Sequence, residues 1–181
     1  MTEEEIIDHL ADPNKRSAVF SQLVRMYQER IYWHIRKMVL SHEDSNDVMQ
    51  NVFMKAWNAI DQFRGEAKLS SWLYRIATNE SITFLTQQKN KASSSMDEES
   101  FLLNQLHSDE YFDGNEAELK LQEAILTLPD KQRLVFNMKY FDNLTYEQME
   151  AILETSVGAL KASYHHAVKK IEKKLIESID D

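Results

Sequence analysis

The scarcity of turn-forming residues constrains the fold of this chain more than any other feature of its sequence. The 181 residues include only three glycines (Gly65, Gly114 and Gly158) and two prolines (Pro13 and Pro129). Sheet-rich folds need many turns, and turns are built largely from glycine, proline and small polar residues. We therefore predict an all-α fold made of long helices.

The distribution of charge divides the chain into three parts. Residues 1–91 carry 12 acidic and 12 basic side chains, residues 92–118 carry 8 acidic side chains and neither Lys nor Arg, and residues 119–181 carry 10 acidic and 9 basic ones. The net charge of −9 thus comes almost entirely from the middle part, so it does not argue against nucleic-acid binding by the flanking parts. We predict two small helical domains, 1–91 and 119–181, joined by a flexible acidic linker, 92–118.

The linker also contains a short apolar patch, formed by Phe101, Leu102, Leu103 and Leu106. Two interpretations follow: a mostly solvated linker, which the dense negative charge favours, or a short helix that docks through this patch.

Several classes of protein are excluded or disfavoured by composition. Without cysteine the chain has no disulfides, thiolate zinc sites or cysteine nucleophiles. The segment Met1–Glu5 is acidic where a signal peptide would be basic, and no apolar run approaches the roughly 20 residues that span a bilayer. No glycine-rich phosphate loop or HExxH motif occurs. We expect a cytoplasmic protein that is not inserted into a membrane, is not an enzyme and needs no cofactor or metal.

Apolar residues at helical spacing predict three helices in the N-terminal part. The stripes are Phe20, Leu23, Val24, Tyr27, Ile31 and Met38; Val48, Val52, Ala56, Trp57, Ile60 and Phe63; and Leu69, Trp72, Leu73, Ile76 and Ala77. Ser41 or Ser45 can cap the second helix and Ser70 the third. We expect the core to form around Trp57, Phe63 and Trp72.

The C-terminal part predicts a helix-turn-helix. Helices are expected over residues 116–126 and from Pro129 to about Asp142, followed by a short helix over 146–153 with a Thr145–Gln148 capping box. Ser156 can then cap a long final helix with a basic face. A short helix, a turn of three residues and a longer helix are typical of DNA-binding helix-turn-helix motifs, although an ordinary helical hairpin fits the same pattern.

Three segments resemble, in order, the sigma-70 superfamily, specifically its small extracytoplasmic-function (ECF) members. They are DSNDVMQNVF at 44–53, FRGEAKLSSWLYRIATN at 63–79, and LTLPDKQR at 126–133 followed by 146–167. The resemblance implies an RNA polymerase sigma factor, with a region 2 helical bundle and a region 4 helix-turn-helix, that directs core polymerase to a promoter class. The implied partners are the β′ clamp helices and β flap of bacterial polymerase, promoter DNA and an anti-sigma factor.

The resemblance also assigns residues to three sites. The residues that the resemblance assigns to polymerase binding are Asp44, Asp47, Gln50, Asn51 and Phe53. Recognition and melting of the −10 element fall to Arg64, Gly65, Glu66, Lys68, Tyr74, Arg75 and Asn79, with a flipped base held by the loop and Asn79. Recognition of the −35 element falls to Ser156, Gly158, Lys161, Ala162, His165 and Lys169. We expect Trp72 to pack in the core and Tyr74 to be the solvent-exposed aromatic.

The chain departs from the family pattern in the helix-turn-helix. Glu154 stands where the family usually has glycine, and Ala159, Ser163 and His166 replace residues that often contact DNA. A stand-alone helix-turn-helix regulator is the alternative function, but it leaves the segments at 44–53 and 63–79 unexplained.

Overall fold

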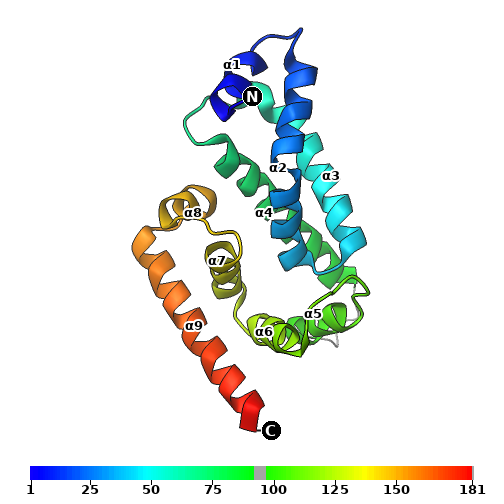
Figure 1. The fold of residues 1–181 in the computed structure, drawn as a ribbon, viewed down its shortest axis with the longest axis vertical. Helices are drawn as coiled ribbons and strands as arrows, with labels where there is room; N and C mark the ends of the chain where they lie inside the picture. The colour runs from blue at the N-terminus through cyan, green and yellow to red at the C-terminus, as the bar shows by residue number, and fades with distance from the viewer. Residues whose placement is uncertain (92–96, 181) are drawn as a thin grey trace. The chain divides into compact units, whose positions relative to one another are not determined.

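The computed structural model describes residues 1–91 and 97–180, and within these ranges it contains nine α-helices, one 3-10 turn and no strand (Figure 1). Contacts divide the chain into two units, Met1–Val39 with Glu43–Leu85, and Leu40–His42 with Thr86–Asp181. Over the same ranges, no helix is both long and apolar enough to cross a membrane. The all-α prediction is confirmed.

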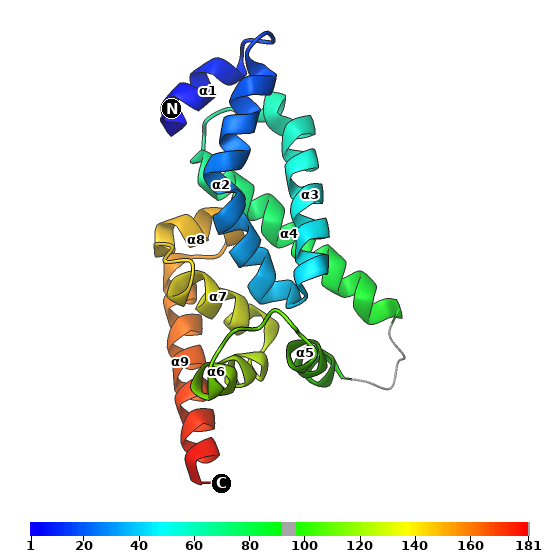
Figure 2. The same ribbon diagram turned by 45° about the vertical axis from the view of Figure 1, so that its right-hand side comes forward.

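The first unit is built from four helices. They are α1 (Glu3–Leu10), α2 (Arg16–Val39), α3 (His42–Ala59), which runs into the 3-10 turn η1 (Ile60–Gln62), and α4 (Leu69–Lys91), whose last residues belong to the second unit. Helix α4 passes diagonally behind α2 and α3 (Figures 1 and 2). Most residues of this unit with no exposed surface are aliphatic, and two are serines: Ile6, Leu23, Ile31, Ile35, Val52, Ala56, Leu69, Leu73 and Ala77, with Ser45 and Ser81.

The predicted centre of this core was wrong in one respect. Trp57 is 37% exposed, and aliphatic side chains such as Leu23 and Leu73 fill the space between the helices instead. Phe63 and Trp72 are half-buried and pack against each other, with ring centroids 5.4 Å apart. Trp72 therefore packs as predicted, although at the edge of the core.

One helix start differs from the sequence expectation, and another decides between two expected caps. Helix α4 begins at Leu69, so Ser70 lies inside the helix and is not its N-cap. Helix α3 begins at His42 and Ser45 is buried within it, so its boundary agrees with Ser41 as the flanking residue. Helix α1 was not predicted; it opens with a capping box between Thr2 and Glu5.

The second unit is organised around the last helix. It contains α5 (Glu98–His107), α6 (Glu116–Leu126), α7 (Asp130–Tyr140), α8 (Tyr146–Leu153) and α9 (Val157–Asp180). Helices α6, α7 and α8 all pack against α9. One buried cluster joins α6, α7 and α9: Ala124, Ile125, Leu128, Phe136, Ala167 and Ile171.

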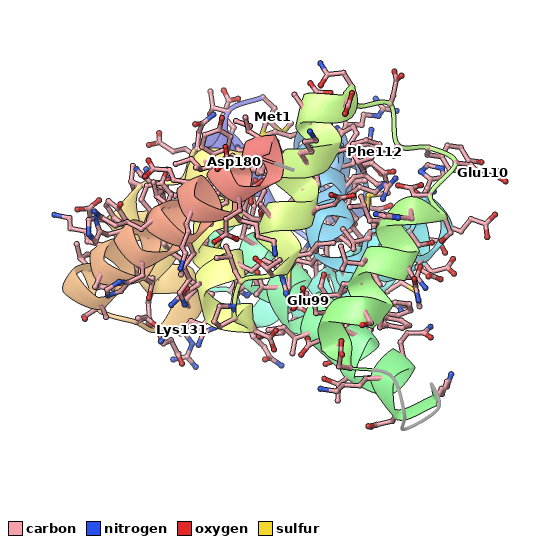
Figure 3. All side chains as sticks on the ribbon, turned by 90° about the horizontal axis from the view of Figure 1, so that it is seen from below. Met1, Glu99, Glu110, Phe112, Lys131 and Asp180 are labelled. Carbon is pink, nitrogen blue, oxygen red and sulfur yellow. The ribbon has the colours of Figure 1, made fainter. Side chains whose placement is uncertain are left out.

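Helix α5 decides between the two interpretations of the acidic segment for residues 97 onwards. Asp97 caps the helix by accepting a hydrogen bond from the Ser100 amide at 2.7 Å. Leu102 and Leu106 are buried, and His107 Nε2 lies 2.9 Å from Glu123 Oε1 of α6. The docked helix is the interpretation that applies here, and the chain continues past Glu110 and Phe112 to α6 (Figure 3). The small polar stretch 92–95 lies outside the described residues.

Candidate nucleic-acid and polymerase interfaces

The loop between η1 and α4 is an exposed, polar turn with a packed base. Phe63 before the loop and Trp72 after it contact each other, so both ends of the loop are anchored. Gly65 has φ +72°, and a Cβ there would meet nothing within 4 Å. Glycine is therefore favoured by the left-handed backbone conformation and not by lack of space. Arg64 and Lys68, on either side of it, are exposed.

The first turns of α4 extend this polar surface on one face. Arg75 and Asn79, one turn apart, are both exposed, as predicted for groups that contact DNA. The prediction for Tyr74 was wrong, because its side chain is only 1% exposed. Its ring packs edge-on against His34 of α2, with ring centroids 5.0 Å apart. Tyr74 therefore joins α4 to α2 and does not present an aromatic face to solvent.

Glu3 of α1 fixes the position where the loop ends and α4 begins. Its Oε1 accepts a hydrogen bond from the Leu69 amide at 2.7 Å, at the N-terminus of α4. Its Oε2 accepts one from the hydroxyl of Tyr27 in α2 at 3.0 Å. Burial and the neighbouring Glu3 carboxylate raise the pKa of Tyr27 well above its ordinary value. A carboxylate at a helix N-terminus is stabilised by the helix dipole, so α1 acts as a remote cap for α4.

An apolar groove runs between α2 and α3, with a cavity volume of about 510 Å³. Its lining residues carry no charge: Phe20, Val24, Gln28, Met49, Gln50, Phe53, Met54, Trp57 and Asn58. Met54 is 64% exposed and Trp57 37%, so large apolar side chains face solvent here. Exposed apolar surface of this kind is typical of surfaces that bind another molecule.

One end of the groove is held by Arg16, at the start of α2. Its Nη1 lies 2.8 Å from Asp61 Oδ2, and its Nη2 donates to the Trp57 carbonyl at 2.9 Å. The guanidinium also lies 4.7 Å from the centroid of the Trp57 ring, while Phe20 packs against the same ring. These contacts position an indole that the helix periodicity alone assigned to the core.

The predicted polymerase residues fall partly on this groove. Gln50 and Phe53 line it, and Asp47 and Asn51 are exposed on the same helix α3. Asp44 is half-buried in the first turn. The sequence analysis missed the contributions of Phe20, Val24, Met49, Met54 and Trp57. For Met49, Met54 and Trp57 the signal was present as apolar side chains on α3 beyond the Val48–Val52–Ala56 stripe that fills the core, while Phe20 and Val24 belong to the apolar stripe of α2.

The helix-turn-helix of the second unit has the predicted caps. Thr145 and Gln148 form a capping box at the start of α8, and Ser156 Oγ accepts from the Ala159 amide at 3.3 Å. Glu154 adopts the left-handed conformation, with φ 53° and ψ 39°, at the end of α8. Glu150 closes the turn, since its Oε2 accepts from the Val157 amide at 3.0 Å.

All six residues that we predicted for −35 recognition are exposed; Ser156 lies just before α9 and the other five lie on the helix. These six residues are Ser156, Gly158, Lys161, Ala162, His165 and Lys169. The opposite face is buried through Leu160, Ala167 and Ile171. Lys161 lies 5.7 Å from the centroid of the Tyr146 ring of α8, so the two helices of the motif contact each other beside the recognition face.

Comparisons with known proteins agree with this two-part architecture. The family profile for Sigma-70 region 2 matches residues 23–91, and that for Sigma-70, region 4 matches residues 118–171. A helical region 2 followed by a region 4 helix-turn-helix defines a sigma factor of the sigma-70 type.

The relatives place the chain more narrowly. The ECF RNA polymerase sigma factor SigW of Bacillus subtilis (strain 168) is 31% identical over 165 residues, covering 86% of this chain and 88% of SigW. The ECF RNA polymerase sigma-E factor of Escherichia coli (strain K12) is 29% identical over 185 aligned positions, covering 97% and 95%. The chain belongs to the ECF group of RNA polymerase sigma factors.

Two solved structures share the fold. CnrH, solved in complex with the cytosolic domain of CnrY, gives a TM-score of 0.70 at 21% identity over 97% of both chains. The sigma factor RpoE of Bartonella quintana, solved in complex with the anti-sigma factor NepR, gives 0.67 at 20% identity over 86% of this chain and 96% of that one.

Proposed function

We propose that this sigma factor opens promoter DNA with the exposed surface formed by the 64–68 loop and the first turns of α4. The observation that carries the proposal is the combination of Arg64, Lys68 and Arg75 with Asn79 on one exposed, anchored surface. Melting requires cations along the backbone and hydrogen-bonding groups that capture a base after it leaves the stack. Asn79 supplies the amide for a base edge, and Gly65 allows close approach of the loop backbone.

The groove between α2 and α3 is the proposed docking site for core polymerase. Its apolar lining suits a helical partner such as the β′ clamp helices, because apolar side chains bury well against a helix face. The exposed polar groups of Asp47, Gln50 and Asn51 border it on α3 and would provide the polar rim that protein interfaces usually have.

The exposed face of α9 is the proposed reader of the −35 element. Lys161 can contact guanine acceptors or a phosphate from the first turns of the helix, and Lys169 can contact the backbone further along. The contact between this unit and the β flap follows from the family membership and is part of the same proposal.

An anti-sigma factor is the proposed regulatory partner. Both solved relatives carry a bound partner: the cytosolic domain of CnrY on CnrH, and the anti-sigma factor NepR on RpoE. A protein that covers the α2–α3 groove would compete with polymerase for the same apolar surface.

Run-off transcription tests the proposal directly. The full chain is added to bacterial core polymerase on a pool of upstream DNA fragments, and Asn79→Ala is compared with Asn90→Ala, an exposed asparagine on the same helix. We expect specific transcripts that depend on the protein, are lost with Asn79→Ala and persist with Asn90→Ala. Tight duplex binding without polymerase, and no transcripts, would favour the stand-alone regulator instead.

A further inference from the structure

Trp33 is a large aromatic side chain that the fold leaves in solvent. It lies on α2, and half of its surface (50%) is exposed. Tyr32 packs edge-on against the indole, with ring centroids 5.2 Å apart, and Lys37 Nζ lies 5.4 Å from the indole centroid. The indole is thus flanked on the surface by a second ring and a cation.

Cations lie near Trp33 on α2. Between residues 25 and 37 the helix carries Arg25, Arg30 and Lys37 outside the core against one acidic residue, Glu29, while Arg36 is buried. The spacing of Met26, Arg30, Trp33 and Lys37 places them on one stripe of the helix. Exposed aromatic side chains interleaved with cations are the combination that binds single-stranded nucleic acid, because every base has a face that can stack.

The stripe adjoins the surface proposed to read the −10 element. Arg30 lies 5.7 Å from the centroid of Tyr74 in α4, and His34 Nε2 lies 2.8 Å from Thr78 Oγ1. These contacts pack this part of α2 against α4 and place Arg30 beside Tyr74, the residue that precedes the exposed Arg75. Since Phe20, Val24 and Gln28 of α2 face α3, the stripe lies on the other flank of α2.

We propose that Trp33, with Arg30 and Lys37, is a stacking platform for an unpaired base of the non-template strand beside the bases held by Asn79. This inference rests on the proposed function and assigns α2 a direct part in it. Two flanks of the same helix then serve different partners. The flank toward α3 is an uncharged apolar groove suited to protein, and the flank that carries Arg30, Trp33 and Lys37 is aromatic and cationic and suited to DNA.

Binding of holoenzyme to a promoter with a premelted bubble tests the platform. Holoenzyme formed with Trp33→Ala should bind the bubble about 5- to 100-fold more weakly than wild type, the range expected from loss of one stacked base. Trp33→Phe keeps an aromatic face and should retain most of the affinity. Abasic sites placed one at a time in the non-template strand identify the base, since at one position the abasic site should abolish the difference between wild type and Trp33→Ala.

Three results would overturn the inference. Unchanged binding of the bubble by holoenzyme with Trp33→Ala would contradict the stacking role of Trp33. If Trp33→Ala weakened bubble binding equally at every abasic position, Trp33 would not stack on a particular base. If Trp33→Ala weakened the affinity for core polymerase in the absence of DNA, Trp33 would belong to a protein contact. Failure of the proposed function is distinct, because wild type would then give no transcripts and Asn79→Ala would change nothing.

Discussion

His34 Nε2 lies 2.8 Å from Thr78 Oγ1 in the core between α2 and α4, and both side chains are almost fully buried. The Thr78 hydroxyl donates to the Tyr74 carbonyl at 2.7 Å, so its oxygen is left to accept from the imidazole. His34 Nε2 therefore carries a proton that it donates to Thr78 Oγ1, and the pair fixes the register of the two helices.

Thr78→Val should lower the free energy of unfolding by about 1–3 kcal/mol, because the nearly isosteric side chain removes the acceptor for a buried N–H group. Urea denaturation measures the change. Thr83→Val, at an exposed position of the same helix, is the matched control and should change stability far less. Equal effects of the two substitutions would argue against the buried hydrogen bond.

Glu3→Ala should also destabilise the first unit by about 1–3 kcal/mol, since it removes the acceptor of both the Leu69 amide and the Tyr27 hydroxyl. Glu3→Gln retains an amide oxygen and should lose less. Thermal unfolding compares both with Glu4→Ala, an exposed neighbour in the first turn of α1. If Glu4→Ala is as harmful as Glu3→Ala, the effect belongs to α1 in general and not to the remote cap.

The raised pKa of Tyr27 predicts a loss of stability at alkaline pH. Its pKa in the folded protein lies above the ordinary value of 10.0, chiefly because of burial and then because of Glu3. Above pH 10 the unfolded chain releases this proton while the folded chain keeps it, so the stability contribution falls as pH rises from there. Unfolding free energies measured from pH 8 upwards should show a shallower alkaline decline in Tyr27→Phe. The exposed Tyr111→Phe should follow wild type, and a Tyr27→Phe profile parallel to wild type would contradict the prediction.

Glu154→Gly should stabilise the second unit by about 1 kcal/mol, because glycine adopts the left-handed conformation observed here without a Cβ penalty. Glu154→Ala removes the charge but keeps the Cβ, so it separates the two contributions. Calorimetry of the three proteins should therefore show the highest stability for Glu154→Gly, above both wild type and Glu154→Ala. A gain with alanine as large as with glycine would assign the cost to the carboxylate.

Asp47→Lys should weaken binding to core polymerase while leaving the fold intact, because Asp47 is exposed beside the apolar groove. Titration of labelled core polymerase measures affinity, and circular dichroism checks the fold. Asp8→Lys makes the same charge change at an exposed position of α1 and should bind as wild type does. Unchanged affinity of Asp47→Lys would count against the proposed docking site.

The sequence by itself determined the features that depend on neighbours a few residues apart. Helix α8 and its Thr145–Gln148 box, the Ser156 cap and the left-handed Glu154 all follow from hydrogen bonds or backbone preferences within one turn. The all-α class follows in the same way from the scarcity of glycine and proline. Local interactions of this kind can be inferred from the order of the residues alone.

Only the tertiary structure decided which side of an amphipathic helix meets which partner. Periodicity cannot distinguish Tyr74, buried against α2, from an exposed aromatic, or Trp57, half-exposed in a groove, from a core residue. The helix that the sequence had suggested to start with a Ser70 cap begins instead at Leu69, whose amide finds its acceptor in Glu3, 66 residues away. These outcomes depend on burial and hydrogen bonding between distant segments, and those energies exist only once the helices have packed.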